Sequence, residues 1–427
     1  MKQHIYPARR LSGKIRLQGD KSISHRALMI GAIAEGTTEI ANLNSGKDVQ
    51  STISCLLRLG VKIENENDRT IVHGRGLSGL AKPNGTLDVG NSGTTIRLLS
   101  GILAGQEFST NITGDDSIQK RPMARIAQPL RKMGAQIDAV ADDFAPLSIK
   151  GGKLTPIDYT LPVASAQVKS CLLLAGLYSE GVTKILEPAE SRDHTERMLS
   201  FFEGRVEKNG SGISVKGPAR LKGQNISVPG DLSSAAFFIA AAVLVKNSEI
   251  VLESIGINPT RTAFLDLLIN MGANIEMSNS KEVNNEPVAD IQVKSSALKG
   301  VTISGETIPA LIDEIPILAI LATQADGITK ISDAQELRHK ESDRLRTVAL
   351  NLKKMCAHVE ENIDGLTIKG PVQLKASELD SFHDHRIAMS FAVAGLIAPS
   401  KSVINNAECV DVSCPGFYQE LARLSGA

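Results

Sequence analysis

The stretch 15-IRLQGDKSISHRALMIGAIAEGTTEI-40 contains a short strand, a polar loop, an apolar helix that runs to a glycine, and the start of another strand. The helix is apolar on nearly all sides, so we expect it to be buried rather than to lie on a surface. The same succession recurs in 87–105, 160–185, 226–245, 308–331 and 380–397. The polar loops are about 70 residues apart, the length of one structural repeat, and are marked by Asp20, Asn91, Ser165, Asp231, Asp313 and Asp384.

A second helix with a common ending lies between successive polar loops. The segments 56-LLRLGVKI-63 and 130-LRKMGAQI-137 place a glycine where a left-handed C-cap belongs, and 352-LKKMCAHV-359 is a variant without it. Two short alternating runs joined by a turn, as in 61-VKIENENDRTIVHG-74, then close the unit. The chain is therefore predicted to contain six β-α-β-α-β-β units.

Such a unit has a buried helix and a sheet on one side only, so it cannot be stable alone. We expect three units to pack around their helices in each of two α/β domains. The fourth unit begins like the first, with 223-GQNISVPGDLS-233 beside 13-GKIRLQGDKS-22. We therefore expect residues 18–228 to form one domain, and residues 1–17 with 229–427 to form the other.

The composition excludes several classes of protein. Lys and Arg number 47 and so do Asp and Glu, which gives no basic field for nucleic acid. The longest apolar stretches are too short to span a membrane, and the N-terminus lacks the apolar region of a signal peptide. Five scattered cysteines without C-x-x-C spacing indicate a reducing compartment. We expect a cytoplasmic monomer.

The polar loops precede apolar helices, and a helix N-terminus attracts anions through its unsatisfied N–H groups. Several such termini facing one cleft would bind anionic substrates without a basic surface. Each polar residue could equally serve only as a helix cap or lie on a solvated face. The candidates are Lys21, Ser22, Arg26, Gly93, Arg121, Ser165, Gln167, Arg192, Asp313, Lys340, Glu341, Arg344 and Arg386.

Two of these loops lead to specific expectations about local structure. We expect a helix to begin at Ser191, with Arg192 and His194 exposed. We also expect 338-RHKESDRL-345 to form one helical start in which Lys340 and Arg344 share a face. The pair His383 and His385 lacks a third ligand at helical spacing, so we expect no metal site.

Taken together, the motifs resemble the successive signatures of the 5-enolpyruvylshikimate-3-phosphate synthase family, and they span the whole chain in the family's order. They are GDKSISHR, GNSGTTIRLL, KRPMARI, ASAQVKS, SRDHTE, PGDLSSAAF, NPTRT, LIDEIP, HKESDRL and DHRIAM. ASAQVKS and SRDHTE resemble the second of the family's two bacterial sequence classes. The resemblance implies a two-domain inside-out α/β barrel with the active site between the domains, which we expect substrates to close.

The resemblance also implies transfer of the enolpyruvyl group of phosphoenolpyruvate to the 5-hydroxyl of shikimate 3-phosphate, with no cofactor and no metal. Matching positions for phosphoenolpyruvate are Lys21, Gly93, Arg121, Gln167, Arg344 and Arg386. Matching positions for shikimate 3-phosphate are Lys21, Ser22, Arg26, Ser165, Gln167, Arg192, Asp313 and Lys340. Asp313 matches the proton acceptor. Glu341, assisted by Lys21, is our choice for protonating the methylene carbon, and Lys21 itself is the alternative donor.

The chain departs from the better-known class near its end. In 411-DVSCPGF-417, Val412 replaces a basic residue and Cys414 replaces an aromatic one. A lysine contact from this segment to phosphoenolpyruvate is therefore not implied. Gly93 stands where a larger residue would crowd an inhibitor that resembles phosphoenolpyruvate, and the response to such herbicides stays open.

Two alternative functions remain. The first is the sister enzyme that acts on UDP-N-acetylglucosamine, which carries Lys-Asn where this chain has Lys21-Ser22 and usually has a reactive cysteine in a loop that here lacks one. The second is a sensor that binds an anionic metabolite without chemistry. Such a sensor would have no need of the carboxylates Asp313 and Glu341, because negative charge weakens the binding of anions.

Overall fold

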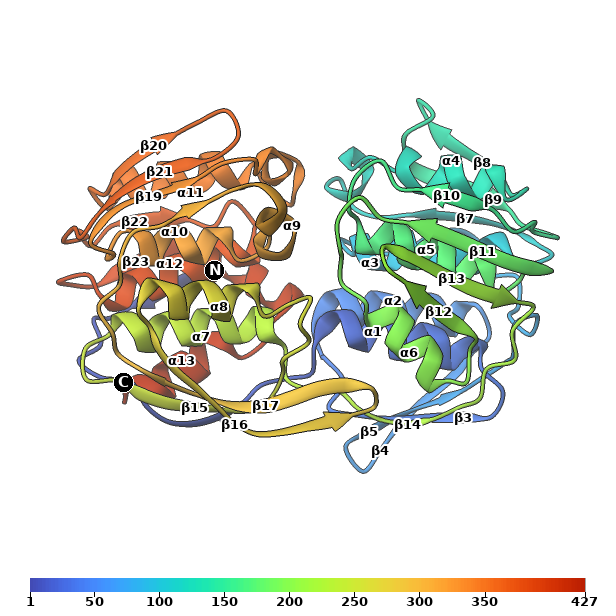
Figure 1. Cartoon of the computed structure of the whole chain (residues 1–427), viewed down its shortest axis with the longest axis horizontal. Helices are drawn as coiled ribbons and strands as arrows, with labels where there is room; N and C mark the ends of the chain where they lie inside the picture. The colour runs from blue at the N-terminus through green and yellow to red at the C-terminus, as the bar shows by residue number, and fades with distance from the viewer. Residues whose placement is uncertain (427) are drawn as a thin grey trace. The chain divides into compact units, whose positions relative to one another are not determined.

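The computed structural model describes residues 1–426, which form two compact units (Figure 1). Unit 1 comprises Met1–Gln18, Pro229–Glu282 and Pro287–Ala427, and unit 2 comprises Gly19–Val228 and Val283–Glu286. Each unit has its own hydrophobic core. Each is an inside-out α/β barrel, with sheets outside and apolar helices inside.

Unit 2 contains three four-stranded sheets, with orders β14-β3-β5-β4, β6-β7-β9-β8 and β10-β11-β13-β12. Its strands are β3 (Thr37–Ala41), β4 (Lys62–Glu66), β5 (Arg69–His73), β6 (Leu87–Asp88), β7 (Ser109–Thr113), β8 (Gln136–Val140), β9 (Phe144–Lys150), β10 (Asp158–Thr160), β11 (Gly181–Leu186), β12 (Val206–Asn209), β13 (Gly212–Gly217) and β14 (Asn225–Ser227). Its α-helices are α1 (Lys21–Ile33), α2 (Lys47–Arg58), α3 (Gly93–Ala104), α4 (Ala124–Lys132), α5 (Ala166–Gly176) and α6 (His194–Phe201).

Unit 1 contains two four-stranded sheets, β16-β17-β15-β2 and β18-β19-β21-β20, and one three-stranded sheet, β1-β23-β22. Its strands are β1 (Lys2–Ile5), β2 (Ser12–Arg16), β15 (Glu249–Gly256), β16 (Asn274–Val283), β17 (Glu286–Lys294), β18 (Thr302–Ile303), β19 (Gly327–Ile331), β20 (His358–Glu361), β21 (Leu366–Gly370), β22 (Glu378–Asp380) and β23 (Ser402–Asn405). Its α-helices are α7 (Leu232–Leu244), α8 (Ala263–Met271), α9 (Ile308–Leu311), α10 (Ile315–Ala322), α11 (Arg344–Lys354), α12 (His385–Leu396) and α13 (Phe417–Ser425).

One strand pattern repeats in the sheets. In the sheet β6-β7-β9-β8, Leu87 of β6 pairs in parallel with Ile112 of β7, and β9 then joins β7 and β8 through antiparallel ladders. A parallel pair needs a crossover, and that crossover is the buried helix α3. The predicted succession of strand, buried helix and strand is therefore a parallel crossover within four of the sheets, where β6 pairs with β7, β10 with β11, β18 with β19 and β22 with β23.

The first helix of most units is buried on all sides, as predicted from its composition. All of α12 is buried, and so is α7 from Leu232 to Val243. In unit 2 the buried helices α3 and α5 pack against each other, and in unit 1 α12 packs against α7 and α10. Their sheets face outward with alternating exposed and buried residues, as in β7. Burial at about 25 cal/mol per Å² of apolar surface is the main stabilising term.

Strands β2 and β14 each pair with a strand that belongs to a different repeat from their own. Strand β2 precedes α1 in the chain, yet it pairs in parallel with β15 of unit 1. Strand β14 precedes α7, yet it pairs in parallel with β3 of unit 2. The tip of the β16–β17 hairpin, Val283–Glu286, also belongs to unit 2, which the sequence did not indicate.

The fifth and sixth units differ from the predicted pattern. In the fifth unit, the helix expected after β18 is broken into α9 and α10, with Ile312, Asp313 and Glu314 between them. In the sixth, no hairpin follows the second helix position. Strand β1 pairs antiparallel with β23 instead, and α13 packs on β2.

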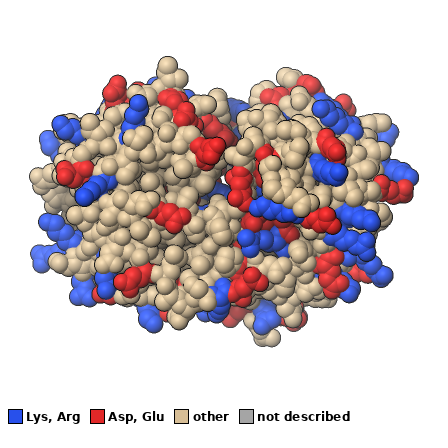
Figure 2. Space-filling view, in the orientation of Figure 1, with Lys and Arg blue, Asp and Glu red and all other residues tan. Residues whose placement is uncertain are grey.

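Acidic and basic side chains both lie on the surface (Figure 2). Figure 2 shows acidic and basic side chains interspersed over the face in view. No helix among residues 1–426 is both long enough and apolar enough to cross a membrane.

The ends of the second helices test the predicted left-handed C-caps. Gly60, Gly134 and Gly272 have φ of 81°, 103° and 104°, and Cys356 has φ of 61° at the corresponding place. A side chain in this conformation costs about 1 kcal/mol or more. The missing glycine therefore changes the residue but not the backbone conformation.

We predict that Cys356→Gly raises the free energy of unfolding by about 0.5–1 kcal/mol, because relief of the left-handed strain outweighs the added chain entropy. Denaturant unfolding measures this change. The matched control is Gly134→Ala, where the nearest atom to an added Cβ is 3.6 Å away. It should destabilise by about 1 kcal/mol. A Cys356→Gly variant less stable than wild type would contradict the assignment.

Candidate active site

The buried helices of unit 2 begin with side-chain caps. Asp20 accepts a hydrogen bond from Ile23 N before α1, Ser92 from Thr95 N before α3, and Ser165 from Val168 N before α5. Capping and anion binding are therefore compatible at these termini, since one side chain satisfies one of several free N–H groups. The candidates Lys21, Ser22, Gly93 and Gln167 follow directly after these caps.

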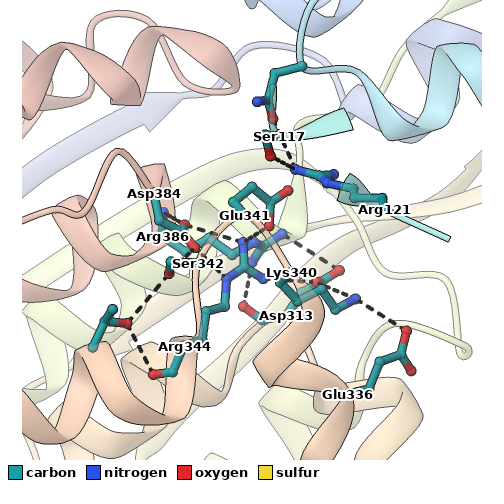
Figure 3. A network of polar contacts seen from close by, with 12 residues as sticks. Ser117, Arg121, Asp313, Glu336, Lys340, Glu341, Ser342, Arg344, Asp384 and Arg386 are labelled. Carbon is teal, nitrogen blue, oxygen red and sulfur yellow. Dashed lines mark hydrogen bonds and ion pairs between the residues drawn. The ribbon is translucent and has the colours of Figure 1, made fainter. Parts of the chain in front are cut away.

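The cations of unit 2 are held by neutral and acidic partners. Lys21 Nζ lies 2.8 Å from Asp48 Oδ2 of α2. Arg121 is mostly buried, and its Nη2 donates to Asn91 Oδ1 and to Ser117 Oγ, each at 3.1 Å (Figure 3). Asp48 was not predicted from the sequence, because nothing in its motif shows that α2 lies beside the start of α1.

A second arginine, Arg97, joins the predicted residues of this unit. Its Nη1 donates to Gln167 Oε1 at 2.5 Å, and Gln167 Nε2 donates to Thr94 Oγ1 at 3.2 Å. These bonds link the starts of α3 and α5. A Cβ placed on Gly93 would lie 3.1 Å from Arg121 Nη1 and 3.2 Å from Arg97 Nη1. The absent side chain thus lets two guanidinium groups approach one helix start.

Arg26 is buried in α1 and bonded through all three nitrogens. Nε donates to Thr195 Oγ1 at 2.6 Å, Nη1 to Ser22 O at 2.9 Å, and Nη2 to Ser170 Oγ at 2.8 Å. Burial lowers the pKa of Arg26 to about 10, and the nearby Glu196 carboxylate opposes this shift. The guanidinium still has N–H groups left for a ligand, because it carries five donors.

A buried chain of hydroxyls fixes the starts of α1 and α3. His25 Nδ1 lies 2.7 Å from Thr52 Oγ1, which lies 2.7 Å from Thr95 Oγ1, and Thr95 donates to Ser92 Oγ. Burial lowers the pKa of His25 well below its usual value, so the ring is neutral at pH 7. The three helices α1, α2 and α3 are thus tied together beside the candidate residues.

The structure corrects the expectation for the segment before α6. The helix begins at His194 rather than at Ser191, and its N-cap residue is Asp193. His194 is buried rather than exposed, and its Nδ1 lies 2.7 Å from Glu286 Oε1 at the hairpin tip. Arg192 lies in the segment before this helix and is partly exposed. The sequence could not show that a distant hairpin would cover His194.

In unit 1, Asp313 lies in the break between α9 and α10 and is surrounded by cations. Its Oδ1 is 3.7 Å from Lys340 Nζ and 3.5 Å from Arg344 Nη1, and its Oδ2 is 3.8 Å from Arg386 Nη2 (Figure 3). The side chain is 17% exposed. One carboxylate thus lies among three of the cations predicted for anion binding.

Arg344 begins α11 and contacts three carboxylates. Nε donates to Asp384 Oδ2 at 2.8 Å, Nη2 to Glu341 Oε2 at 2.6 Å, and Nη1 to Asp313 Oδ1 at 3.5 Å. Burial by itself would lower the pKa of Arg344, but Asp384 and Glu341 raise it above the ordinary value. Burial would likewise raise the pKa of Asp384, yet Arg344 holds it below the usual range.

Arg386 is the second residue of α12 and contacts the segment between α9 and α10. Its Nη1 donates to Asp313 O at 2.6 Å and lies 3.4 Å from Glu314 Oε1. Ser233 Oγ, near the start of α7, donates to the same oxygen of Glu314 at 2.6 Å. Arg261 in turn contacts Ser233. PGDLSSAAF and NPTRT contain Ser233 and Arg261, but only the structure connects them to Arg386.

The predicted shared helical face of Lys340 and Arg344 is wrong. Residues Gln335–His339 form a 3-10 turn, Lys340 is extended, and α11 starts only at Arg344 after the N-cap Asp343. Arg338 pairs with Asp343 and Glu361 and so closes this bend. Lys340 and Arg344 nevertheless both lie near Asp313, because the bend rather than a helix brings them together.

The arrangement indicates two kinds of chemistry. Unit 2 contributes cations, amides and hydroxyls, which bind anions. Unit 1 contributes cations together with the carboxylates Asp313 and Glu341, which can also transfer protons. Within residues 1–426, no group of three or more His, Cys, Asp or Glu side chains is arranged to hold a metal ion.

Comparisons with known proteins agree over the whole length. The model of the EPSP synthase (3-phosphoshikimate 1-carboxyvinyltransferase) family matches residues 5–421. A Brevibacillus brevis protein named 3-phosphoshikimate 1-carboxyvinyltransferase is 52% identical over 422 residues, with 99% of each chain covered. A protein of the same name from a Thermoanaerobacter species is 54% identical over 414 residues, which cover 97% of this chain and 98% of that one.

Solved structures extend this similarity to the fold. EPSP synthase from Acinetobacter baumannii is 45% identical with a TM-score of 0.89, covering 99% of this chain and 98% of that one. An enolpyruvyl transferase from Streptomyces tendae is 17% identical with a TM-score of 0.81, covering 99% and 96%. The second likeness concerns the fold alone.

We predict that Asp384→Asn lowers the free energy of unfolding by about 3 kcal/mol at pH 7, because it removes a buried partner of Arg344 while keeping a good N-cap residue. The folded-state pKa of Asp384 is lowered, so its contribution is present above pH 3.8 and is lost as the pH falls through the folded value. Denaturant unfolding of wild type and variant should therefore show a constant difference from pH 7 down to pH 4, and the difference should shrink only at lower pH.

The control for this ion pair is Asp231→Asn. Asp231 caps α7 in the same way, but its Oδ1 lies 3.8 Å from Arg261. Its loss should cost about 1 kcal/mol or less. Equal losses for the two variants would show that the cap, not the ion pair, carries the stability.

Proposed function

Because the chain belongs to the EPSP synthase family, we propose specific roles for its side chains in the family's reaction. The enzyme transfers the enolpyruvyl group of phosphoenolpyruvate to the 5-hydroxyl of shikimate 3-phosphate and releases phosphate. This is a step of the shikimate pathway to aromatic amino acids. The observation that carries our proposal is Asp313, a carboxylate among three cations.

Phosphoenolpyruvate carries a phosphate and a carboxylate, and we propose six residues for them. Two guanidinium groups, at the starts of α11 and α12, suit bidentate binding of carboxylate or phosphate. Because Gly93 has no side chain, the guanidinium group of Arg121 lies close to the start of α3. The proposed set is Lys21, Gly93, Arg121, Gln167, Arg344 and Arg386.

Shikimate 3-phosphate also carries a phosphate and a carboxylate, together with hydroxyl groups. Hydroxyl and amide side chains at the starts of α1 and α5 suit its hydroxyls, and the arginines and lysines suit its charges. The proposed set is Lys21, Ser22, Arg26, Ser165, Gln167, Arg192, Asp313 and Lys340. The two sets draw on both units, and we propose that the substrates are held by residues of both.

We propose that Asp313 accepts the proton of the 5-hydroxyl of shikimate 3-phosphate, while the oxygen of that hydroxyl attacks the second carbon of phosphoenolpyruvate. Glu341, assisted by Lys21, donates a proton to the methylene carbon, which becomes a methyl group. The tetrahedral intermediate then breaks its bond to the phosphate oxygen, one methyl proton returns to the Glu341 carboxylate, and the carbon–carbon double bond forms again. The cations around Asp313 would stabilise the negative charge of the phosphate that leaves.

Two further expectations belong to this proposal. We propose that the enzyme is a monomer and acts in the cytoplasm, and the five free thiols support a reducing compartment. The two alternative functions are less well supported. UDP-N-acetylglucosamine transfer is disfavoured by Ser22 after Lys21, and pure binding is disfavoured by carboxylates placed among the anion-binding cations.

We predict that Asp313→Asn lowers kcat by at least about 10²-fold, because the amide keeps the shape but cannot accept the proton. Phosphate release from phosphoenolpyruvate measures this, with and without shikimate 3-phosphate. Glu336→Gln is the matched control, since Glu336 Oε1 is 3.8 Å from Lys340 but its side chain is 52% exposed. It should retain activity within about twofold.

The possible outcomes test the substrate and the identity of the proton acceptor separately. Phosphate release that does not need shikimate 3-phosphate would contradict the proposed substrate. Full activity of Asp313→Asn would move the base to another carboxylate, with Glu314 the first to be tested. Turnover with UDP-N-acetylglucosamine would favour the sister enzyme, and binding without turnover would favour the sensor.

We also predict that Gly93→Ala raises KM for phosphoenolpyruvate by about 10-fold or more, because the added Cβ displaces Arg97 or Arg121. KM for shikimate 3-phosphate should change by less than about threefold, since its proposed ligands lie mainly on α1 and α5. Steady-state kinetics with each substrate varied in turn measures the split. An equal rise in both values would contradict the assignment of Gly93 to phosphoenolpyruvate.

A further inference from the structure

A buried ammonium group connects α5 to the segment that leads into α6. Lys169 is 1% exposed, and its Nζ lies 2.7 Å from Glu187 Oε2 and 2.7 Å from Glu196 Oε1. The same Nζ donates to Ser191 O at 3.2 Å. Glu187 directly follows β11, and Glu196 lies in the first turn of α6. Lys169 therefore contacts both ends and the middle of residues 187–196.

The contacts converge on the residue that precedes Arg192. The Ser191 carbonyl accepts from Lys169, and the Ser191 hydroxyl donates to Glu187. Both the backbone and the side chain of Ser191 are thus fixed. Because the carbonyl of Ser191 belongs to the peptide bond that leads to Arg192, fixing it also fixes where the Arg192 side chain starts.

The neighbouring residues connect this cluster to Arg26. Ser170 follows Lys169 and accepts from Arg26 Nη2, and Thr195 precedes Glu196 and accepts from Arg26 Nε. Burial raises the pKa of Glu196, and Lys169 opposes that rise. The cluster therefore lies directly beside two arginines proposed for shikimate 3-phosphate.

Stability alone does not explain such a cluster. Desolvating three charges costs several kcal/mol per ion, and apolar side chains of similar volume are often as stable or more so. The rest of α5 around Lys169 is apolar, with Leu172, Leu173 and Leu174 all buried. A lysine at this place is therefore explained better by what it orients than by what it stabilises.

We propose that Lys169 is a positioning residue that sets the affinity for the phosphate of shikimate 3-phosphate by fixing the peptide that carries Arg192. The inference rests on the proposed role of Arg192 at that phosphate. Lys169 itself does not touch the substrate in this scheme. It acts through Ser191, with Glu187 and Glu196 as its fixed partners.

The test compares a paired variant with a surface control. Lys169→Met with Glu187→Gln removes the anchor together with one buried charge of each sign, so the net buried charge is unchanged. The control is Lys208→Met with Glu190→Gln, a 47% and 60% exposed ion pair that involves the same segment. Lys169→Arg should retain the ion pairs of the anchor, since arginine keeps the positive charge and has N–H donors.

Calorimetry measures the Kd of shikimate 3-phosphate, and inhibition kinetics measures the Ki of shikimate, which lacks the phosphate. The paired variant should bind shikimate 3-phosphate about 10- to 100-fold more weakly, as expected for a lost charge-assisted hydrogen bond. Shikimate Ki and phosphoenolpyruvate KM should change by less than about threefold. The surface control should match wild type, and Lys169→Arg should recover most of the affinity.

A double-mutant cycle tests whether Lys169 affects the affinity through Arg192. In an Arg192→Ala background, the paired variant should cause little further loss of affinity, because the side chain that it positions is already absent. Equal weakening of shikimate and shikimate 3-phosphate, or unchanged affinity in the paired variant, would overturn the inference.

Two further outcomes keep the test decisive. Wild-type protein that does not bind shikimate 3-phosphate would overturn the proposed function, and this inference with it. If thermal unfolding shows that the paired variant does not fold, Ser191→Ala takes its place. That milder change should weaken shikimate 3-phosphate about threefold and leave shikimate unchanged, and no difference between the two ligands would overturn the inference.

Discussion

A helix surrounded by apolar side chains can meet polar groups only at its ends, and this constraint organises both units. α7 and α12 are buried along nearly their whole length, so their first N–H groups must be satisfied by caps or by a ligand. Asp231 and Asp384 provide the caps. Most of the polar residues proposed for the chemistry lie near such helix starts, whereas Arg26 lies within α1, where Thr195, Ser22 and Ser170 accept its hydrogen bonds.

The same constraint explains why the cations are paired with acids before any substrate binds. Arg344 is 1% exposed, and a guanidinium without partners at that depth would be strongly destabilising. Asp384 holds its position, whereas Glu341 and Asp313 also face the reaction proposed for this site. The residues proposed to transfer protons thus also pair with the arginine proposed to bind an anion, so one cluster would serve both stability and catalysis.

The sequence predicts those features that are local or periodic. The repeat indicated the buried helices and the two-domain α/β fold, and composition with spacing indicated that polar residues gather at helix starts. Features made by contacts distant in the chain could not be predicted. Nothing near Lys169 in the sequence shows that Glu187 and Glu196 pair with it. His194 was expected to be exposed because its partner Glu286 is on a hairpin 92 positions away.

Local propensity also misled where geometry is decided by neighbours. The run 338-RHKESDRL-345 has a helical composition, yet Arg338 is held by Glu361 and Asp343, and the chain bends at Lys340. Conversely, Cys356 keeps the left-handed conformation without glycine, and strand β20 follows it at His358–Glu361. The family motifs therefore do not predict the backbone conformation around the candidate residues.

The exchange of β2 and β14 has a consequence for how the chain folds as it leaves the ribosome. Unit 2 has nearly all its residues once Val228 has been synthesised, so its core can form early. Strands β1 and β2 are made first but must wait for β23 and β15, which come far later in translation. The opening segment thus stays without its sheet partners for most of synthesis, and vectorial folding favours the middle of the chain over its beginning.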